Sequence, residues 1–241
     1  MQVYLIEQRE EDVPESNDWL AERERNHVRT LTFLKRRADW RLGRWAAKCA
    51  IASLQDIPLH PDLLTTIEIC PLPSGAPQVF LHNLPADVSI SLSHRSGVAI
   101  CARAANSVRL GCDLEVIEPH SAEFVADYFS VEEQELMEKV ASADRWRAVA
   151  LLWSAKESAL KVLQEGLRRD TRSVVVKTGS LSFAESWSSL EVHSIEGDAF
   201  HGWWRQVDGM VQTVVADHSF AAPVDLQAPS SWPPKSSADA A

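Results

Sequence analysis

The chain has 241 residues, 45% of them hydrophobic and 24% charged, and its 34 acidic and 24 basic residues give a formal net charge of −10. A chain of this length can bury a core as one large or two small domains, which excludes a disulfide-stapled miniprotein. No apolar run approaches the roughly 18 residues of a membrane span, and the first residues lack a signal-peptide pattern, so we expect a cytoplasmic protein without a membrane span. The acidic balance argues against a nucleic-acid-binding protein, because such proteins gain affinity by neutralising phosphates with basic side chains.

The first long element is predicted to be helical. Apolar residues recur near helical spacing over 19–55, with a break expected near a basic run, and Pro58 and Pro61 end the pattern. The basic run, 29–48, contains seven basic residues and one acidic residue. A charge run is usually a solvated helix face, and binding of an anion is the alternative.

The middle of the chain is predicted to form a small antiparallel sheet. Hydrophobic residues alternate with serines from 88 to 93, which is typical of a strand that ends at His94. Further strands are expected at 78–82, 98–102 and 108–115. The proline-rich residues around the first of these predict loops.

The second part of the chain is predicted to run from two helices into strands. Ser130 and Glu133 have the spacing of a capping box, so a helix should begin near Val131. A longer helix is expected over 144–164, with Gly166 placed to end it. Strands are expected at 174–176, 190–195, 200–207 and 210–216.

Both parts of the chain therefore lead from helices into antiparallel strands, which is compatible with an internal duplication. We divide the chain into an N-terminal half, 1–106, and a C-terminal half, 107–222. The composition of 223–241 collapses to Ala, Pro and Ser, which predicts a disordered tail.

Two carboxylates lie on one face of a predicted strand. Asp113 and Glu115 are two residues apart, so their side chains project to the same side, about 6–7 Å apart along the chain. Magnesium prefers oxygen ligands of this kind together with substrate phosphates. The alternative is an Asp-x-Glu pair that simply faces solvent.

A second charged group lies on the long predicted helix. Trp153, Glu157 and Lys161 are spaced four apart, so they share one helix face. The flanking residues are apolar, and charges on an interior helix need partners. A cation between helix and strand would provide one, whereas an exposed Glu–Lys pair is the alternative.

His94, at a strand end, is either a surface or core residue or a hydrogen-bond partner of a phosphate.

At this point three motifs resemble those of the Sfp-type 4'-phosphopantetheinyl transferases, in the family's order and approximate spacing. They are Ser91-Leu-Ser-His94, Gly111-Cys-Asp-Leu-Glu115 and Trp153-Ser-Ala-Lys-Glu-Ser-Ala-Leu-Lys161. Weaker resemblances are Arg36 with Gly43-Arg44, similar to a basic helix before the core, and Ser74-Gly75-Ala76-Pro77, similar to a Gly-x-Pro loop.

The resemblance, which spans about residues 30–176, implies the phosphopantetheinyl transferase fold. This is an α+β fold of two similar halves related by a pseudo-twofold axis, each with a small antiparallel sheet and helices, and with coenzyme A between them. The resemblance implies that Asp113, Glu115 and Glu157 are ligands of Mg²⁺. It also implies that Glu157 is the base that accepts the proton of the carrier-protein serine. Lys161, which we expect to act in catalysis, matches a position near the phosphates.

Further residues are implied to contact coenzyme A. They are Arg36, Arg44, Ser93, His94, Lys156 and Lys161. Two departures from the family pattern affect this set. Ala76 stands where some members have a basic residue, so a phosphate contact is either missing or supplied by Arg95. Arg36 and Arg37 are adjacent, and the pattern leaves open which of them faces the ligand.

The function implied is transfer of the 4'-phosphopantetheine arm of coenzyme A to a serine of an apo acyl or peptidyl carrier protein, with release of 3',5'-ADP. A magnesium-dependent phosphohydrolase acting on a nucleotide or coenzyme A, and a non-catalytic carrier-binding module, are the alternatives. We expect a monomer, because a duplicated fold builds its site within one chain.

The surface that meets the carrier is expected to be apolar with basic edges, because such carriers are commonly acidic around the modified serine. Four residues after the Asp-x-Glu strand are candidates for it. They are Phe124, Tyr128, Phe129 and Met137. Packing of these residues against a helix is the alternative.

Overall fold

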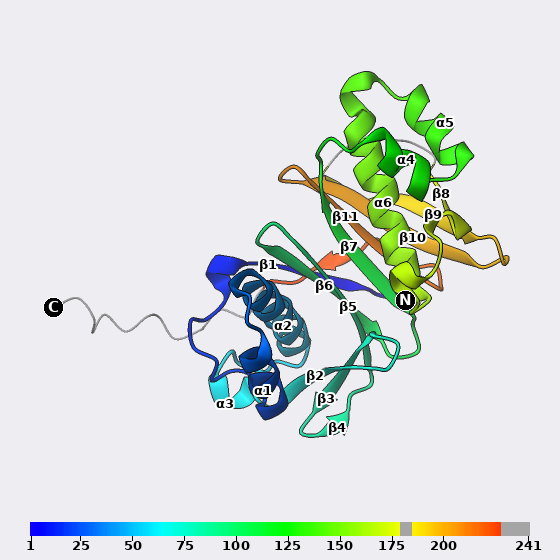
Figure 1. Cartoon of the computed structure of the whole chain (residues 1–241). Coiled ribbons are helices and arrows are strands. Elements are labelled where there is room, and N and C mark those ends of the chain that lie inside the picture. Colours follow the sequence, from blue (N-terminus) through cyan, green and yellow to red (C-terminus); the bar gives the residue numbers. More distant parts are fainter. Residues whose placement is uncertain (179–184, 228–241) are drawn as a thin grey trace.

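The computed structural model describes residues 1–178 and 185–227 and shows a mixed α+β fold with several small sheets. We describe the residues before and after 107 as its first and second halves. In each half a long helix lies against an antiparallel sheet (Figure 1). The helices and strands of the first half are β1 (Tyr4–Arg9), α1 (Glu22–Thr30), α2 (Leu34–Leu54), α3 (Pro61–Leu64), β2 (Ile67–Pro71), β3 (Pro77–Leu81), β4 (Leu84–Pro85), β5 (Val88–Arg95) and β6 (Val98–Ala105).

The second half contains the other helix-and-sheet layer. Its elements are β7 (Leu110–Val116), α4 (Ala122–Tyr128), α5 (Val131–Lys139), α6 (Arg145–Val162), β8 (Val174–Lys177), β9 (Ser188–Ser194), β10 (Ala199–Val207) and β11 (Met210–Ala216). The last strand, β12 (Val224–Asp225), joins the first-half sheet beside β1. Short 3-10 turns lie at Glu10–Asp12, Ser142–Asp144, Gly166–Arg168 and Thr171–Ser173. No helix in the described parts of the chain is long and apolar enough to cross a membrane.

Two strand pairings recur in the two halves. The first half has the order β12-β1-β6-β5 beside a small β2-β3-β4 sheet, and the second has β7-β11-β10-β9-β8. The pairs β1–β6 and β7–β11 are both antiparallel, as are β6–β5 and β11–β10. This agreement supports the predicted duplication, while the pseudo-twofold axis itself stays a prediction.

A buried ion pair holds the first half together. Glu24, in the first turn of α1, accepts hydrogen bonds from the amides of Ala21 (3.0 Å) and Ile69 (3.1 Å). Its carboxylate lies 2.8 Å from the ammonium of Lys48 on α2, and neither side chain is more than 3% exposed. Lys48 Nζ also donates to three backbone carbonyls, those of Trp19, Leu64 and Ile67.

The second half repeats this arrangement. Glu133, in the first turn of α5, accepts from the amides of Ser130 and Val176, both at 2.9 Å. Its carboxylate lies 2.7 Å from the ammonium of Lys156 on α6, again with both side chains buried. Lys156 Nζ also donates to two carbonyls, those of Thr171 and Val174. In each half, one pair therefore joins a short helix, the long helix and a strand.

This placement corrects the role expected for Lys156. Its ammonium has no exposed surface for a phosphate, and its neighbours are the Glu133 carboxylate and backbone carbonyls. Burial lowers the pKa of Lys156, and the Glu133 carboxylate counteracts the shift. Lys156 is a structural residue.

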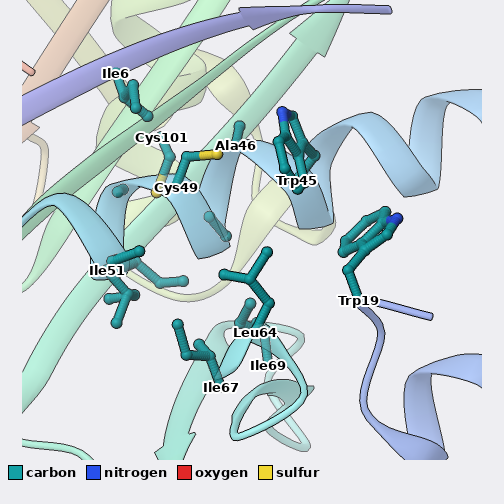
Figure 2. Close-up of a cluster of buried hydrophobic side chains, with 14 of the residues drawn as sticks. Ile6, Trp19, Trp45, Ala46, Cys49, Ile51, Leu64, Ile67, Ile69 and Cys101 are labelled. Atoms are coloured by element: carbon teal, nitrogen blue, oxygen red, sulfur yellow. The ribbon is translucent and has the colours of Figure 1, made fainter. Parts of the chain in front are cut away.

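The apolar core of the first half packs around α2. Figure 2 shows Trp19 and Trp45 beside one another above a cluster of aliphatic side chains, and their rings meet edge to face with centroids 5.2 Å apart. Cys49 and Cys101 lie in the same core as free thiols.

The predicted helices and the strands from 78 onward are present, with ends that differ by a few residues. The helices and strands that were not predicted are β1, α3, β2, β4, α4 and β12. Part of the predicted disordered tail is ordered, because Val224 and Asp225 form β12 and pair in parallel with β1. The tail from 228 lies outside the described residues.

We predict that Lys156→Met lowers the free energy of unfolding by about 3–5 kcal/mol, because it leaves the Glu133 carboxylate buried without a counter-charge. Urea unfolding measures this loss. The control is Lys139→Met on α5, whose side chain is 73% exposed, and its effect should stay within about 0.5 kcal/mol. A loss below 1 kcal/mol for Lys156→Met would show that the pair is not needed.

Candidate active site

A close approach of β7 to α6 builds the site. Gly111 on β7 packs against the α6 backbone, where a Cβ atom would lie only 1.9 Å from the carbonyl oxygen of Ser158. Any larger residue would push the strand away from the helix. The glycine of the Gly-Cys-Asp-Leu-Glu motif therefore places Asp113 and Glu115 beside Glu157 and Lys161.

Asp113 is the most deeply buried carboxylate of the site, at 3% exposure. Its Oδ1 accepts from Lys161 Nζ (2.9 Å) and from Ser93 Oγ (2.8 Å). Lys161 Nζ also donates to the carbonyl of Cys112 (2.8 Å). Asp113 Oδ2 is buried and has no hydrogen-bond partner. A buried carboxylate oxygen without a partner is costly, and it indicates a place where a ligand binds.

Glu115 lies at the more open side of the site. Its Oε1 accepts from the indole Nε1 of Trp153 (3.1 Å), and its Oε2 lies 3.7 Å from Nε of Arg95. Burial, together with the charge of Asp113, raises the pKa of Glu115 to about 7 despite the nearby arginine. Burial and the same aspartate also raise the pKa of Glu157.

The negative charges of Asp113, Glu115 and Glu157 therefore repel one another, and a bound cation would reduce this repulsion. Lys161 supplies one positive charge beside these carboxylates. Burial lowers the pKa of Lys161, but Asp113 and other nearby groups raise it by more, so its pKa is raised overall. Within the described residues, no three His, Cys, Asp or Glu side chains are arranged to hold a metal ion as they stand. The unpartnered Asp113 Oδ2 and the oxygen-only donor set nevertheless fit Mg²⁺ once these side chains turn toward it.

A cavity of about 500 Å³ opens beside these charges and draws its walls from both halves. Its lining includes the 74–77 loop and Arg44 from the first half and Lys161 from the second. Because Lys161 both lines the cavity and bonds to Asp113, the cavity and the carboxylates form one site. Its mixed polar and apolar lining suits an organic anion.

The arginines of the basic run differ in their placement. Arg44 lines the cavity, stacks over the ring of Trp40 (4.9 Å) and lies 3.7 Å from Glu24. Arg37 donates to the carbonyl of Leu31 and so fixes the end of α1. Arg36 is exposed. Of the two adjacent arginines, Arg36 is therefore the one available to a ligand.

The structure separates the other predicted contacts. Ser93 bonds to Asp113 and so belongs to the carboxylate side of the site. His94 is exposed at the end of β5 and is not part of the cavity lining. Arg95 lies against Glu115 and Glu118 and is likewise absent from that lining, so Arg95 does not replace the basic side chain missing at Ala76.

Arg109 and Ser91 line the cavity but were not among the site residues expected from the sequence. Arg109 lines it, with its Nε held by Asp217 at 3.0 Å. Ser91 lines it and accepts from the amide of Cys112 (2.9 Å), which joins β5 to β7. The serine-faced strand signalled Ser91, whereas Arg109 is brought to the cavity only by the pairing of distant segments.

Residues 109–217 match the family model of the 4'-phosphopantetheinyl transferase superfamily. The matched segment contains all three carboxylates and Lys161, and it begins at the strand that carries Asp113. No curated protein matches the chain significantly. The match and the α+β architecture agree with the fold expected from the sequence.

The pKa of Glu115 predicts a pH dependence of stability in metal-free buffer. Because the folded-state pKa is raised from its ordinary value of 4.5 to about 7, the folded protein binds more protons than the unfolded chain between these values. Stability therefore falls as pH rises through this window, by about 3 kcal/mol from this group.

We predict that Glu115→Gln weakens this fall, as measured by urea unfolding in EDTA at pH 4.5, 6 and 7.5. The exposed Glu11→Gln serves as a control and should keep the wild-type profile. Parallel profiles for wild type and Glu115→Gln would contradict the assigned pKa.

Proposed function

We propose that this protein transfers the 4'-phosphopantetheine arm of coenzyme A to a serine of an apo acyl or peptidyl carrier protein and releases 3',5'-ADP. The proposal is supported chiefly by the position of the carboxylates next to the cavity, to which Lys161 connects them. Asp113, Glu115, Glu157 and Lys161 lie beside a cavity between the halves, within the segment that matches the superfamily. The site is built from a single chain, which supports a monomer.

The cavity suits the nucleotide end of coenzyme A. Arg44 supplies a positive charge inside it, and Arg36 lies further along the same helix at the surface. Arg109, which reaches the cavity from the start of β7, supplies the charge that Ala76 lacks. These cations would bind phosphates, and Lys161 would meet the diphosphate next to the carboxylates.

Asp113, Glu115 and Glu157 would hold the magnesium ion, which neutralises charge on the diphosphate during transfer. Lys161 stabilises the charge that develops on the same oxygens. Glu157 lies in the same carboxylate group, and its carboxylate would accept the proton of the serine.

The reaction needs no covalent intermediate on the protein. The carrier serine Oγ forms a bond to the phosphorus of the pantetheine phosphate, and the bond from that phosphorus to the oxygen bridging to 3',5'-ADP breaks. The serine proton passes to Glu157. Cys112 takes no part, because burial raises the pKa of its thiol and keeps it protonated.

Intact-mass spectrometry of a panel of apo carrier domains tests the proposed function. With coenzyme A and Mg²⁺, a carrier should gain the mass of the phosphopantetheine arm, and its serine-to-alanine form should not. Release of phosphopantetheine without a gain on any carrier would instead identify a hydrolase. If neither reaction occurs, the remaining alternative is a non-catalytic carrier-binding module.

We predict that Asp113→Asn lowers the rate of transfer by at least about 1000-fold, because it removes both a magnesium ligand and the partner of Lys161. Rates are measured at saturating Mg²⁺ with circular dichroism as a check on the fold. The exposed Glu11→Gln should keep the wild-type rate. Turnover of Asp113→Asn within tenfold of wild type would refute the metal assignment.

Arg44→Ala should weaken binding of coenzyme A more than binding of dephospho-coenzyme A, if Arg44 meets the 3'-phosphate. Calorimetric titration of both ligands measures the difference, which we expect to be about tenfold or more. Arg37→Ala is the control, because its guanidinium is already engaged by Leu31. Equal losses for both ligands would assign Arg44 to the diphosphate or to the fold.

A further inference from the structure

The surface beside Glu115 has an exposed apolar centre. Tyr128, at the end of α4, is 39% exposed, and Val131, at the start of α5, is 71% exposed. The Tyr128 ring lies 5.2 Å from the ring of Trp153, whose indole donates to Glu115. We call the exposed face of residues 122–139 the α4–α5 rim. One layer of aromatic side chains separates this rim from the carboxylates.

The rim rests on a packed support. Phe129 and Met137, two of the four residues considered for a carrier surface, are each only 1% exposed, and Phe124 packs between Tyr128 and Trp153. Packing is therefore the correct interpretation for Phe129 and Met137. Tyr128 remains a surface residue, and Val131 joins it.

Residues 122–139 around this apolar centre are predominantly acidic, and Arg172 on the neighbouring 3-10 turn adds one positive charge near Asp127. Residues 122–139 contain six acidic residues and one basic residue, and only one of the acids, Glu133, is buried in an ion pair. The exposed acids are Glu123, Asp127, Glu132, Glu135 and Glu138. The single lysine, Lys139, faces Glu135 at 3.7 Å. The expectation of basic edges is wrong for this surface.

We propose that the α4–α5 rim is the docking surface of the acceptor carrier, and that it selects carriers whose surface around the modified serine is apolar and neutral or basic. The inference rests on the proposed function, because the acceptor serine has to reach the diphosphate beside Glu115. An acidic carrier would meet like charge both from the rim and from the net charge of −10. The negative charge of the rim therefore predicts that the partner's surface is neutral or basic.

One other exposed apolar pair would suit the opposite partner. Phe33 and Leu34, 74% and 79% exposed, precede Lys35 and Arg36 at the start of α2. An acidic carrier would prefer that surface. The contact chain from Tyr128 through Trp153 to Glu115 favours the rim.

The test compares one apo carrier domain in two forms, its native acidic form and a form in which the acidic residues around the serine are changed to lysine. Wild type should show a KM about tenfold lower for the basic form at low salt, with the difference shrinking at 0.5 M NaCl. The rim variant Asp127→Lys/Glu132→Lys should lose or reverse this preference while the KM for coenzyme A stays unchanged.

The matched control is Glu22→Lys/Asp62→Lys. It makes the same change in net charge with exposed acids of α1 and α3, which lie at the other end of the molecule from α4 and α5 (Figure 1). This control should keep the wild-type preference. Val131→Ser should raise the KM for both carrier forms, whereas Ile195→Ser, at a position 74% exposed, should not.

A lower KM for the acidic carrier with wild type, an equal effect of the two charge-reversal variants, or a dependence on Phe33 in place of Val131 would overturn the rim as docking surface. These outcomes leave the proposed function intact, because the carriers still gain the arm. Absence of any mass gain on either carrier form would instead overturn the proposed function, and the docking proposal with it.

Discussion

The fold depends on one interaction that occurs twice, a buried glutamate–lysine pair that joins each long helix to a short helix. Each ammonium is fully removed from water and is held by a carboxylate and by backbone carbonyls. Each carboxylate in turn binds the first amides of a short helix and an amide of a strand. Since losing one partner leaves a bare charge in the core, the pair allows little freedom in how helix and strand meet. The site is built on this fixed geometry.

The two halves share this geometry but differ in the charge placed on it. Trp45 donates to the side chain of Gln8 at 2.9 Å, as Trp153 donates to Glu115, and Trp45 precedes Lys48 by the same spacing as Trp153 precedes Lys156. After the lysine comes Cys49 in the first half and Glu157 in the second. The Gln8 amide and the Cys49 thiol, the latter drawn in Figure 2, take these positions in the first half, whereas the carboxylates of Glu115 and Glu157 take them in the second. The three carboxylates of the candidate site therefore all lie in the second half, and the first half contributes a wall of the cavity.

Periodicity and motif spacing were enough to predict α2, α6 and most strands, together with the grouping of Asp113, Glu157 and Lys161. They were not enough to separate Lys156 from Lys161, because both lie in the same motif. The two are five residues apart and point to different sides of the helix, one into the Glu133 pair and one toward Asp113. The addition of β12 to β1 and the arrival of Arg109 at the cavity depend on contacts between distant segments, which no local pattern records.

We propose that the second-half carboxylates bind a divalent cation together with coenzyme A. Thermal unfolding in coenzyme A, with and without MgCl₂, tests it without any carrier. Saturating Mg²⁺ should raise the Tm of wild type and of Glu11→Gln by about 5 °C, and should leave the Tm of Asp113→Asn unchanged. An equal rise in Asp113→Asn, or no rise in wild type, would contradict the claim.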